Sequence, residues 1–293
     1  MFAPSTSLAA RLSEAFSTAV FRELAREHPD NATHKRIQII AEYGSADGAS
    51  LGEAFNRALR LLVREYRNEY VFKNELVSKI IFGKHSPRTA SALLELRMGR
   101  SWADLVILNG TSTTYEIKTD LDQFARLATQ LSDYTSRSEY VNVVTSDKRA
   151  ATAERHLPDH VGVVAIRSNG AVTTLRPAAS NIHRLVADHL FSMLRTSEVL
   201  ELLGNATGYV LDVPQGNAWA RLKELFAELP IEIAHDGVVA ILRRRGTEAA
   251  KLAGNSAFPF SLRALAYATE LSNVGQQRLL DRLGKPASLV MEG

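Results

Sequence analysis

The feature that most constrains the fold is a change of hydrophobic period near residue 90. Before this point apolar residues recur at helical spacing, whereas Leu94, Leu96 and Met98 alternate with polar residues, which predicts a strand. Two more short strands are expected over residues 103–108 and 114–119, each preceded by a glycine-containing turn. The sequence therefore predicts a meander of three strands.

A helical period returns over residues 121–134, and the apolar run 141–145 predicts a fourth strand. A strand, helix, strand unit of this length is a parallel crossover. Residues 161–166 predict a further strand, and residues 172–175 an edge strand. The sequence thus predicts an α/β protein with a mixed central sheet.

Helical patterns flank the sheet on both sides. We predict one amphipathic helix over residues 8–24, a Gly-rich connection over residues 35–50 and one long helix over residues 51–81. C-terminal helices are expected over 181–203, 217–229 and 261–283, with an Asp236-Gly237 hairpin that joins strands 231–235 and 238–242. We divide the chain into an N-terminal helical segment (1–50), a central domain that holds the sheet (51–177) and a mostly helical C-terminal region (178–293).

Composition excludes several classes of site. The chain has no cysteine, so disulfides, thiolate metal sites and cysteine nucleophiles are excluded. Pro158 separates His156 from His160 and breaks the helix that a zinc-binding pair would need. Glycine patterns that cradle nucleotide phosphates are missing, and no apolar run approaches the roughly 20 residues of a membrane-spanning helix. We expect a cytoplasmic protein that does not bind membranes.

The residues that carry chemistry lie on two neighbouring strands. Asp104 opens one strand, and Glu116 and Lys118 share a face of the next because side chains alternate along a strand. Two carboxylates 4 Å apart repel by about 4 kcal/mol at an effective dielectric constant of 20, so a buried acidic pair needs a cation or a shared proton. Mg²⁺ prefers oxygen ligands, and Lys118 would orient or deprotonate an attacking water and offset charge at phosphorus.

The length of the second turn decides whether these side chains can meet. If Asn109 and Gly110 formed a two-residue turn, Asp104 would oppose Tyr115 and point to the wrong face. We therefore predict a three- or five-residue connection, or a bulge, that brings Asp104 to the side of Glu116.

The pattern of Asp, a turn and Glu-x-Lys resembles the PD-(D/E)xK motif of the restriction-endonuclease-like nuclease superfamily. Residues 67–74, 103–106 and 115–119 also resemble a largely uncharacterised bacterial family within it, and the resemblance covers roughly residues 65–150. Ala103 stands where the motif name has proline. The resemblance implies a core of helix, three-strand meander, helix and parallel strand.

The resemblance also implies an activity and further site residues. It implies hydrolysis of phosphodiester bonds with Mg²⁺ or Mn²⁺, in DNA in preference to RNA, and a setting in bacterial defence or DNA repair. The implied metal ligands are Asp104, Glu116 and Glu69, with Glu75 as the second choice to Glu69. Gln130 is the implied catalytic glutamine, and a homodimer is compatible with the resemblance.

One stripe of the helix after the motif is polar. It holds Gln123, Arg126, Gln130 and Arg137, and we expect its members, together with Lys73, to contact substrate phosphates.

Simpler interpretations remain for each of these residues. A Glu-x-Lys pair is often a cross-strand ion pair on a solvated face, Glu69 and Lys73 have the spacing of a helical salt bridge, and Gln130 could be a surface amide. Residues 243–245, three arginines, could bind phosphates or form a solvated strand end. The alternative functions are an inactive module that binds nucleic acid or a protein, and a toxin or effector that acts on RNA.

Overall fold

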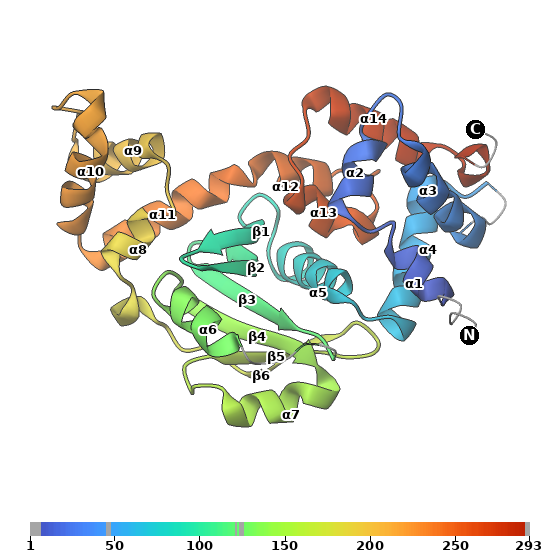
Figure 1. Ribbon diagram of the computed structural model, residues 1–293, viewed down its shortest axis with the longest axis horizontal. Coiled ribbons are helices and arrows are strands. Elements are labelled where there is room, and N and C mark those ends of the chain that lie inside the picture. Colours follow the sequence, from blue (N-terminus) through green and yellow to red (C-terminus); the bar gives the residue numbers. More distant parts are fainter. Residues whose placement is uncertain (1–6, 45–47, 121, 123–125, 291–293) are drawn as a thin grey trace, which may run out of the picture. The chain divides into compact units, whose positions relative to one another are not determined.

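The computed structural model describes residues 7–44, 48–120, 122 and 126–290. Its sheet has six strands in the order β1-β2-β3-β4-β5-β6 (Figure 1). β1, β2 and β3 form an antiparallel meander, and β4 pairs with β3 in parallel. The strands are β1 Ser91–Met98, β2 Ser101–Leu108, β3 Ser112–Lys118, β4 Tyr140–Ser146, β5 Gly162–Ile166 and β6 Val172–Arg176. The predicted α/β class, the mixed sheet and all six strands are confirmed.

The connection between β2 and β3 has three residues. Leu108 pairs with Ser112, so Asn109, Gly110 and Thr111 form the turn, and the Asn109 amide donates to the Thr111 carbonyl at 3.1 Å. Gly110 has a φ of 89°, which a residue without Cβ adopts readily. The predicted three-residue connection is confirmed, and the register ends at the pair Leu105–Tyr115, next to Asp104 and Glu116.

Contacts divide the chain into two compact units. Unit 1 comprises residues 1–87, 166–172 and 248–293, and unit 2 comprises residues 88–165 and 173–247. Unit 1 is helical, and unit 2 holds most of the sheet. Each of the three segments predicted from the sequence is one continuous range, whereas both of these units combine separate parts of the chain. The division into three segments stays a prediction.

Unit 1 corrects three expectations about helices. Residues 8–24 form two helices because the Ser17 side chain accepts from the Val20 amide at 3.3 Å and begins a new helix. Residues 35–44, expected as a connection, lie within α3. The predicted helix 51–81 breaks before Asn68, whose side chain accepts from the Val71 amide at 3.2 Å. The longer helices are α1 Leu8–Ser13, α2 Thr18–Leu24, α3 Asn31–Gly44, α4 Leu51–Glu65, α5 Glu69–Leu76, the π-helix η1 Val77–Lys84, α12 Thr247–Ala253, α13 Arg263–Ala268 and α14 Asn273–Gly284.

Unit 2 contains the helices that pack on the sheet. The predicted helix after β3 is α6, Leu127–Thr135, and residues 121 and 123–125 of that prediction lie outside the described residues. The predicted helix 217–229 is confirmed as α10, whereas 181–203 and 261–283 are each divided into shorter helices. The remaining described helices of unit 2 are α7 Asp147–His156, η2 Ile182–Arg184, α8 Ala187–Phe191, α9 Thr196–Thr207, η3 Gln215–Asn217, α10 Ala218–Ala227 and α11 Ile231–Arg245.

The predicted hairpin at Asp236-Gly237 is wrong, because the whole segment forms α11. Ala234, Val238 and Ile241 are buried at helical spacing, so tertiary packing uses this segment as a helix. Gly237 serves close packing instead of a turn, since a Cβ there would lie 2.6 Å from Cδ1 of Leu202 in α9.

The three arginines at residues 243–245 therefore end a helix rather than a strand. Arg244 lies 2.6 Å from Glu201, and Arg245 lies 2.5 Å from Glu198, both on α9. These ion pairs join α11 to α9 and favour a structural role over phosphate binding.

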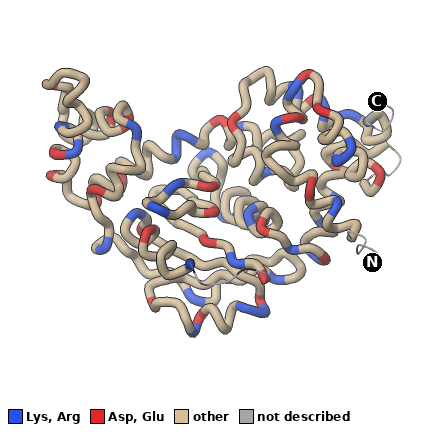
Figure 2. The backbone as a smooth tube through the Cα atoms, in the orientation of Figure 1, with Lys and Arg blue, Asp and Glu red and all other residues tan. Residues whose placement is uncertain are grey.

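Charged residues of both signs are interspersed within each unit (Figure 2). Among the described helices, none combines the length and the apolar character needed to cross a membrane.

The apolar core of unit 2 joins α6, the sheet, α8, α9, α10 and α11, and Tyr134 of α6 is fully buried in it.

Gly99 offers a test of how the β1–β2 turn is held. Its φ is 66°, and an added Cβ would lie 2.4 Å from Oδ1 of Asp133, whose Oδ2 accepts from Ser101 Oγ at 2.7 Å. We expect Gly99→Ala to lose about 1–2 kcal/mol of unfolding free energy from the left-handed backbone and about 1 kcal/mol more from displacement of Asp133. Urea unfolding followed by circular dichroism measures this loss.

Gly110→Ala is the matched control. Its φ is also positive, but nothing lies within 4 Å of an added Cβ. It should lose only the backbone contribution, and equal losses for the two variants would contradict the proposed role of Asp133.

Candidate active site

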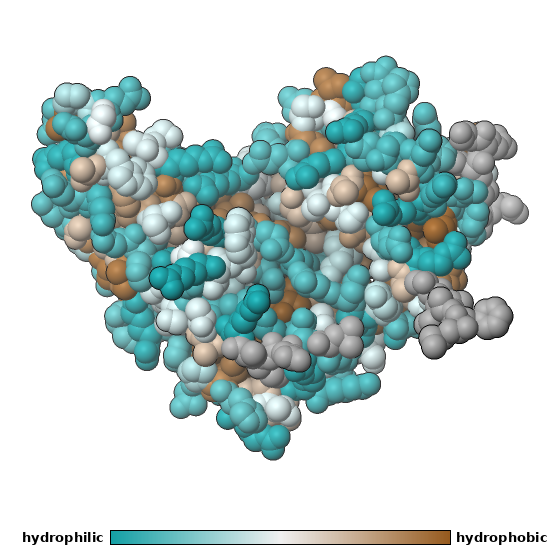
Figure 3. All heavy atoms as spheres, in the orientation of Figure 1, coloured by the Kyte–Doolittle hydropathy of each residue, from teal (hydrophilic) through white to brown (hydrophobic). Residues whose placement is uncertain are grey.

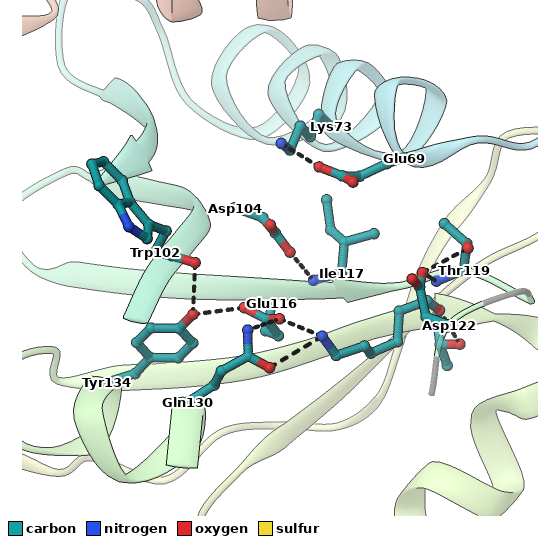
Figure 4. A network of polar contacts seen from close by, with 12 residues as sticks. Glu69, Lys73, Trp102, Asp104, Glu116, Ile117, Thr119, Asp122, Gln130 and Tyr134 are labelled. Atoms are coloured by element: carbon teal, nitrogen blue, oxygen red, sulfur yellow. Dashed lines mark hydrogen bonds and ion pairs between the residues drawn. The ribbon is translucent and has the colours of Figure 1, made fainter. Parts of the chain in front are cut away.

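Glu116 is the centre of a buried polar network on β3. Glu116 is 1% exposed, and its Oε1 accepts from Nζ of Lys118 at 2.6 Å (Figure 4). Ile117 between them is also buried, at 3% exposed. The predicted pairing of Glu116 with Lys118 on one face follows from the two-residue period of a strand.

Gln130 of α6 completes the contact between these two groups. Its Nε2 donates to Oε1 of Glu116 at 2.6 Å, and its Oε1 accepts from Nζ of Lys118 at 3.1 Å. The Gln130 amide thus donates to Glu116 through its nitrogen and accepts from Lys118 through its oxygen. Gln130 is not a free surface amide, and the structure brings it to Glu116 and Lys118 as predicted.

Tyr134 holds the second oxygen of Glu116. Its hydroxyl lies 2.8 Å from Oε2 of Glu116 and 2.8 Å from the carbonyl of Trp102. Burial, and then the charge of Glu116, raises the pKa of Tyr134 well above its usual value, so the hydroxyl stays protonated and can donate. Sequence analysis did not single out Tyr134, the last residue of the helical pattern over residues 121–134, although it lies one helical turn after Gln130 on the same face.

Asp104 is attached to the β3 backbone rather than to this network. It is half-buried, and its Oδ2 accepts from the Ile117 amide at 2.6 Å. Because Ile117 lies between Glu116 and Lys118, this bond holds the Asp104 carboxylate at the same stretch of β3. Figure 4 shows Asp104 reaching Ile117, while Glu116 meets Gln130 and Tyr134.

Glu95 of β1 is a second acid beside Asp104 that sequence analysis missed. The pairs Leu94–Leu105 and Leu96–Ala103 flank it, so it lies across from Asp104. One carboxylate oxygen of Glu95 lies within 4.8 Å of one of Asp104. Glu95 also has a φ of 51°, which is uncommon for a residue with a side chain. Only the register between two strands reveals this neighbour.

The end of β3 is fixed by hydrogen bonds to its backbone and side chains. The amide and Oγ1 of Thr119 each donate to Oδ2 of Asp122 at 2.7 Å. Oγ1 of Thr145 on β4 donates to the Lys118 carbonyl at 2.6 Å. These bonds hold the backbone of Lys118 and so limit where its ammonium can lie.

Glu69 and Lys73 lie on α5 in unit 1. They form an ion pair of 2.5 Å, which agrees with the simpler interpretation of their spacing, and the Lys73 side chain is 10% exposed. Glu75, the second choice for a ligand, is buried, and burial raises the pKa of its carboxyl. The role of Glu69 or Glu75 as a metal ligand and the role of Lys73 as a phosphate contact stay predictions.

The polar stripe predicted on α6 contributes one residue to the network, Gln130. Gln123 lies outside the described residues, and Arg126 is exposed at the start of α6. Arg137 is 7% exposed, and its Nη1 donates to the Asp133 carbonyl at 2.9 Å. The structure therefore places Arg137 in the protein rather than on a surface open to phosphate.

An exposed tryptophan lies near the site and was not singled out by the sequence. Trp102 is 56% exposed and pairs with Arg97 across the β1–β2 hairpin. Arg100 in the turn is exposed as well. An exposed aromatic ring on a hairpin that also carries exposed arginines is a surface suited to nucleic-acid bases and phosphates.

The donor groups at this stretch of sheet fit a hard cation. Asp104 and Glu95 offer carboxylate oxygens, which Mg²⁺ and Mn²⁺ prefer, whereas a zinc site uses nitrogen or sulfur ligands. Among the described residues, Glu116 is not in the group of carboxylates that lie within 4.8 Å of one another. Two carboxylates this close repel each other, and a cation between them lowers that repulsion. The residues present therefore fit a divalent cation.

Fold and site together define an α/β protein whose mixed sheet carries a buried Glu-x-Lys pair completed by a helical glutamine. The chain belongs to the family described as bacteriophage P4 protein cII, which it matches over residues 63–257. Protein cII of Enterobacteria phage P4 is 38% identical over 69 residues, 24% of this chain and 26% of that protein. The match thus spans about a quarter of the phage protein's own length. No solved structure matches the chain.

Removal of the Tyr134 hydroxyl tests how the buried carboxylate is held. Tyr134→Phe leaves the side chain's shape nearly unchanged but takes a donor from Oε2 of Glu116. We expect a loss of about 1–3 kcal/mol in unfolding free energy, because a buried acceptor stays unsatisfied. Thermal and urea unfolding measure the loss.

Tyr43→Phe is the control for this substitution. Tyr43 of α3 is half-buried, and within the described residues its hydroxyl forms no hydrogen bond. Its loss should stay below about 0.5 kcal/mol. If Tyr134→Phe were equally mild, the hydroxyl would not be holding Glu116.

Proposed function

We propose that the chain is a divalent-metal-dependent nuclease of the PD-(D/E)xK type that hydrolyses phosphodiester bonds, in DNA in preference to RNA. The observation that carries the proposal is the network of Glu116, Lys118 and Gln130. The order of elements supports it, since a helix, the β1–β2–β3 meander, α6 and the parallel strand β4 follow one another. This order is the one expected for a restriction-endonuclease-like core.

Asp104 and Glu116 would hold the divalent cation, and Glu95 would add a carboxylate on the side of Asp104. When bound, the cation would polarise a phosphodiester oxygen and offset the charge that develops there. Glu69 stays a proposed third ligand from unit 1. The network on β3 and α6 would keep Glu116 in place.

Lys118 would act on the attacking water and on the phosphate. Its ammonium can donate a hydrogen bond to either one, and it offsets negative charge as the phosphorus gains a fifth oxygen. Gln130 would orient Lys118 through its carbonyl oxygen, 3.1 Å from Nζ. Tyr134 would act as a positioning residue, because it touches Glu116 and not the substrate.

Nucleic acid would approach over the β1–β2 hairpin. Trp102 would stack on a base, and Arg97 and Arg100 would meet phosphates. Arg126 and Lys73 stay proposed phosphate contacts. The proposed settings are bacterial defence and DNA repair, and a homodimer remains part of the proposal.

The Lys118→Ala variant tests the activity. With Mg²⁺ or Mn²⁺ we expect the unaltered protein to cut plasmid DNA and EDTA to stop it. Lys118→Ala should lower the rate about 100-fold or more, as expected when a donor to the transition state is removed. Lys251→Ala is the matched control, because this lysine of α12 is exposed and forms its ion pair, among the described residues, with Glu248 of the same helix.

A second candidate is a module that binds nucleic acid or a protein without catalysis. It is favoured by the fact that both oxygens of Glu116 already accept bonds from side chains of the chain itself, so the network needs no ion to be stable. DNA binding without cleavage at any metal concentration would support this module and refute the nuclease. Cleavage of RNA in place of DNA would identify an RNA-directed enzyme.

Trp102→Ala tests the proposed nucleic-acid surface. In the Lys118→Ala background, which separates binding from cleavage, we expect DNA affinity to fall about 5- to 150-fold, since stacking of one base contributes about 1–3 kcal/mol. Fluorescence anisotropy of a labelled oligonucleotide measures the affinity. Trp219→Ala is the control, because Trp219 of α10 is 44% exposed. Equal affinities for the two variants would exclude Trp102 as a contact.

A further inference from the structure

A pocket of about 730 Å³ lies in unit 2 between α6 and α7, and no residue of the Glu116 network lines it. Its volume falls in the range of about 300–1,000 Å³ that is typical of small-molecule sites. Its described lining residues belong to α6 and α7, to the segment that follows α7 and to η2, which contributes Arg184.

The walls of the pocket are aliphatic. Leu127 and Leu131 come from α6, Ala153 comes from α7, and Leu157 and Pro158 follow α7. Apart from two histidine rings, the described lining contains no aromatic side chain. Figure 3 shows hydrophobic side chains at the surface between the positions of α6 and α7. Such walls suit a flexible hydrocarbon chain, which gains free energy in proportion to the apolar area removed from water.

The polar groups of the pocket are cationic or neutral. Arg184 is exposed, and within the described residues no carboxylate forms an ion pair with it. Burial, and then the charge of Arg184, lowers the pKa of His160, so this ring is neutral at pH 7 and Arg184 supplies the charge. No acidic residue is among the described lining residues. The pocket therefore complements a single negative charge.

His156 adds a second polar contact at the pocket. Its Nδ1 lies 2.8 Å from the Thr152 carbonyl, so Nδ1 carries the proton and Nε2 remains for a ligand or water. The hydroxyls of Ser132, Thr135 and Ser136 are uncharged groups that can bond a head group or its waters.

We propose that this pocket binds an aliphatic carboxylate, with its hydrocarbon chain between α6 and α7 and its carboxylate on Arg184. Arginine suits this role because its guanidinium can donate two parallel hydrogen bonds to a carboxylate. The hydrocarbon packs on Leu127, Leu131 and Leu157. The site is separate from the proposed nuclease site, so the two proposals stand or fall independently.

Binding of decanoate to the full chain by isothermal titration calorimetry tests the proposal. Decyltrimethylammonium, with a similar chain and the opposite charge, is the ligand control. We expect decanoate to bind in a one-to-one ratio below its micelle concentration and the ammonium compound to bind at least tenfold more weakly. Arg184→Gln should weaken decanoate about tenfold or more, as for the loss of a charge-assisted hydrogen bond.

Two further variants separate the pocket from the rest of the surface. Ala128→Trp places a large side chain at an exposed lining position and should abolish decanoate binding without lowering the melting temperature. Arg155→Gln removes an exposed arginine of α7 that does not line the pocket, and it should bind as the unaltered protein does. Absence of decanoate binding, equal binding of both amphiphiles, or full binding by Ala128→Trp would each overturn the proposal.

Discussion

The structure of unit 2 depends on a carboxylate buried in a sheet. Glu116 is almost entirely removed from water, and a buried charge is tolerated only when it is paired and hydrogen-bonded. Lys118 on the same strand supplies the opposite charge, and Gln130 and Tyr134 on α6 supply neutral donors. The network therefore ties α6 to β3, and it accounts for a polar centre within an otherwise apolar core.

The second constraint is the register of the meander. A shift of one residue would turn every side chain of β3 to the other face. The three-residue turn around Gly110 prevents this shift, and Asp104 then reaches the Ile117 amide between Glu116 and Lys118. Two acids and one base thus occupy a short stretch of sheet. The membership in the phage P4 cII family, over residues 63–257, includes this whole stretch.

α6 links the two sites inferred for this chain. Gln130 and Tyr134 contact Glu116, whereas Ala128 and Ser132, on the same helix, line the pocket toward α7. One amphipathic helix therefore directs polar side chains to the sheet network and lines the pocket with leucines and small residues. Its period of 3.6 residues allows both because residues four apart share a side.

The sequence alone determined what depends on local period and chemistry. The meander, the parallel crossover to β4 and the shared face of Glu116 and Lys118 all follow from alternation or helical spacing. Local signals were insufficient where packing or capping prevailed: Gly237 lies in a helix against Leu202, and Asn68 begins a new helix inside a continuous apolar pattern. Only the tertiary structure placed Tyr134 on Glu116 and Glu95 across from Asp104. These partners meet through helix packing and strand register, which are set by contacts between residues distant in the chain and leave no trace in local periodicity.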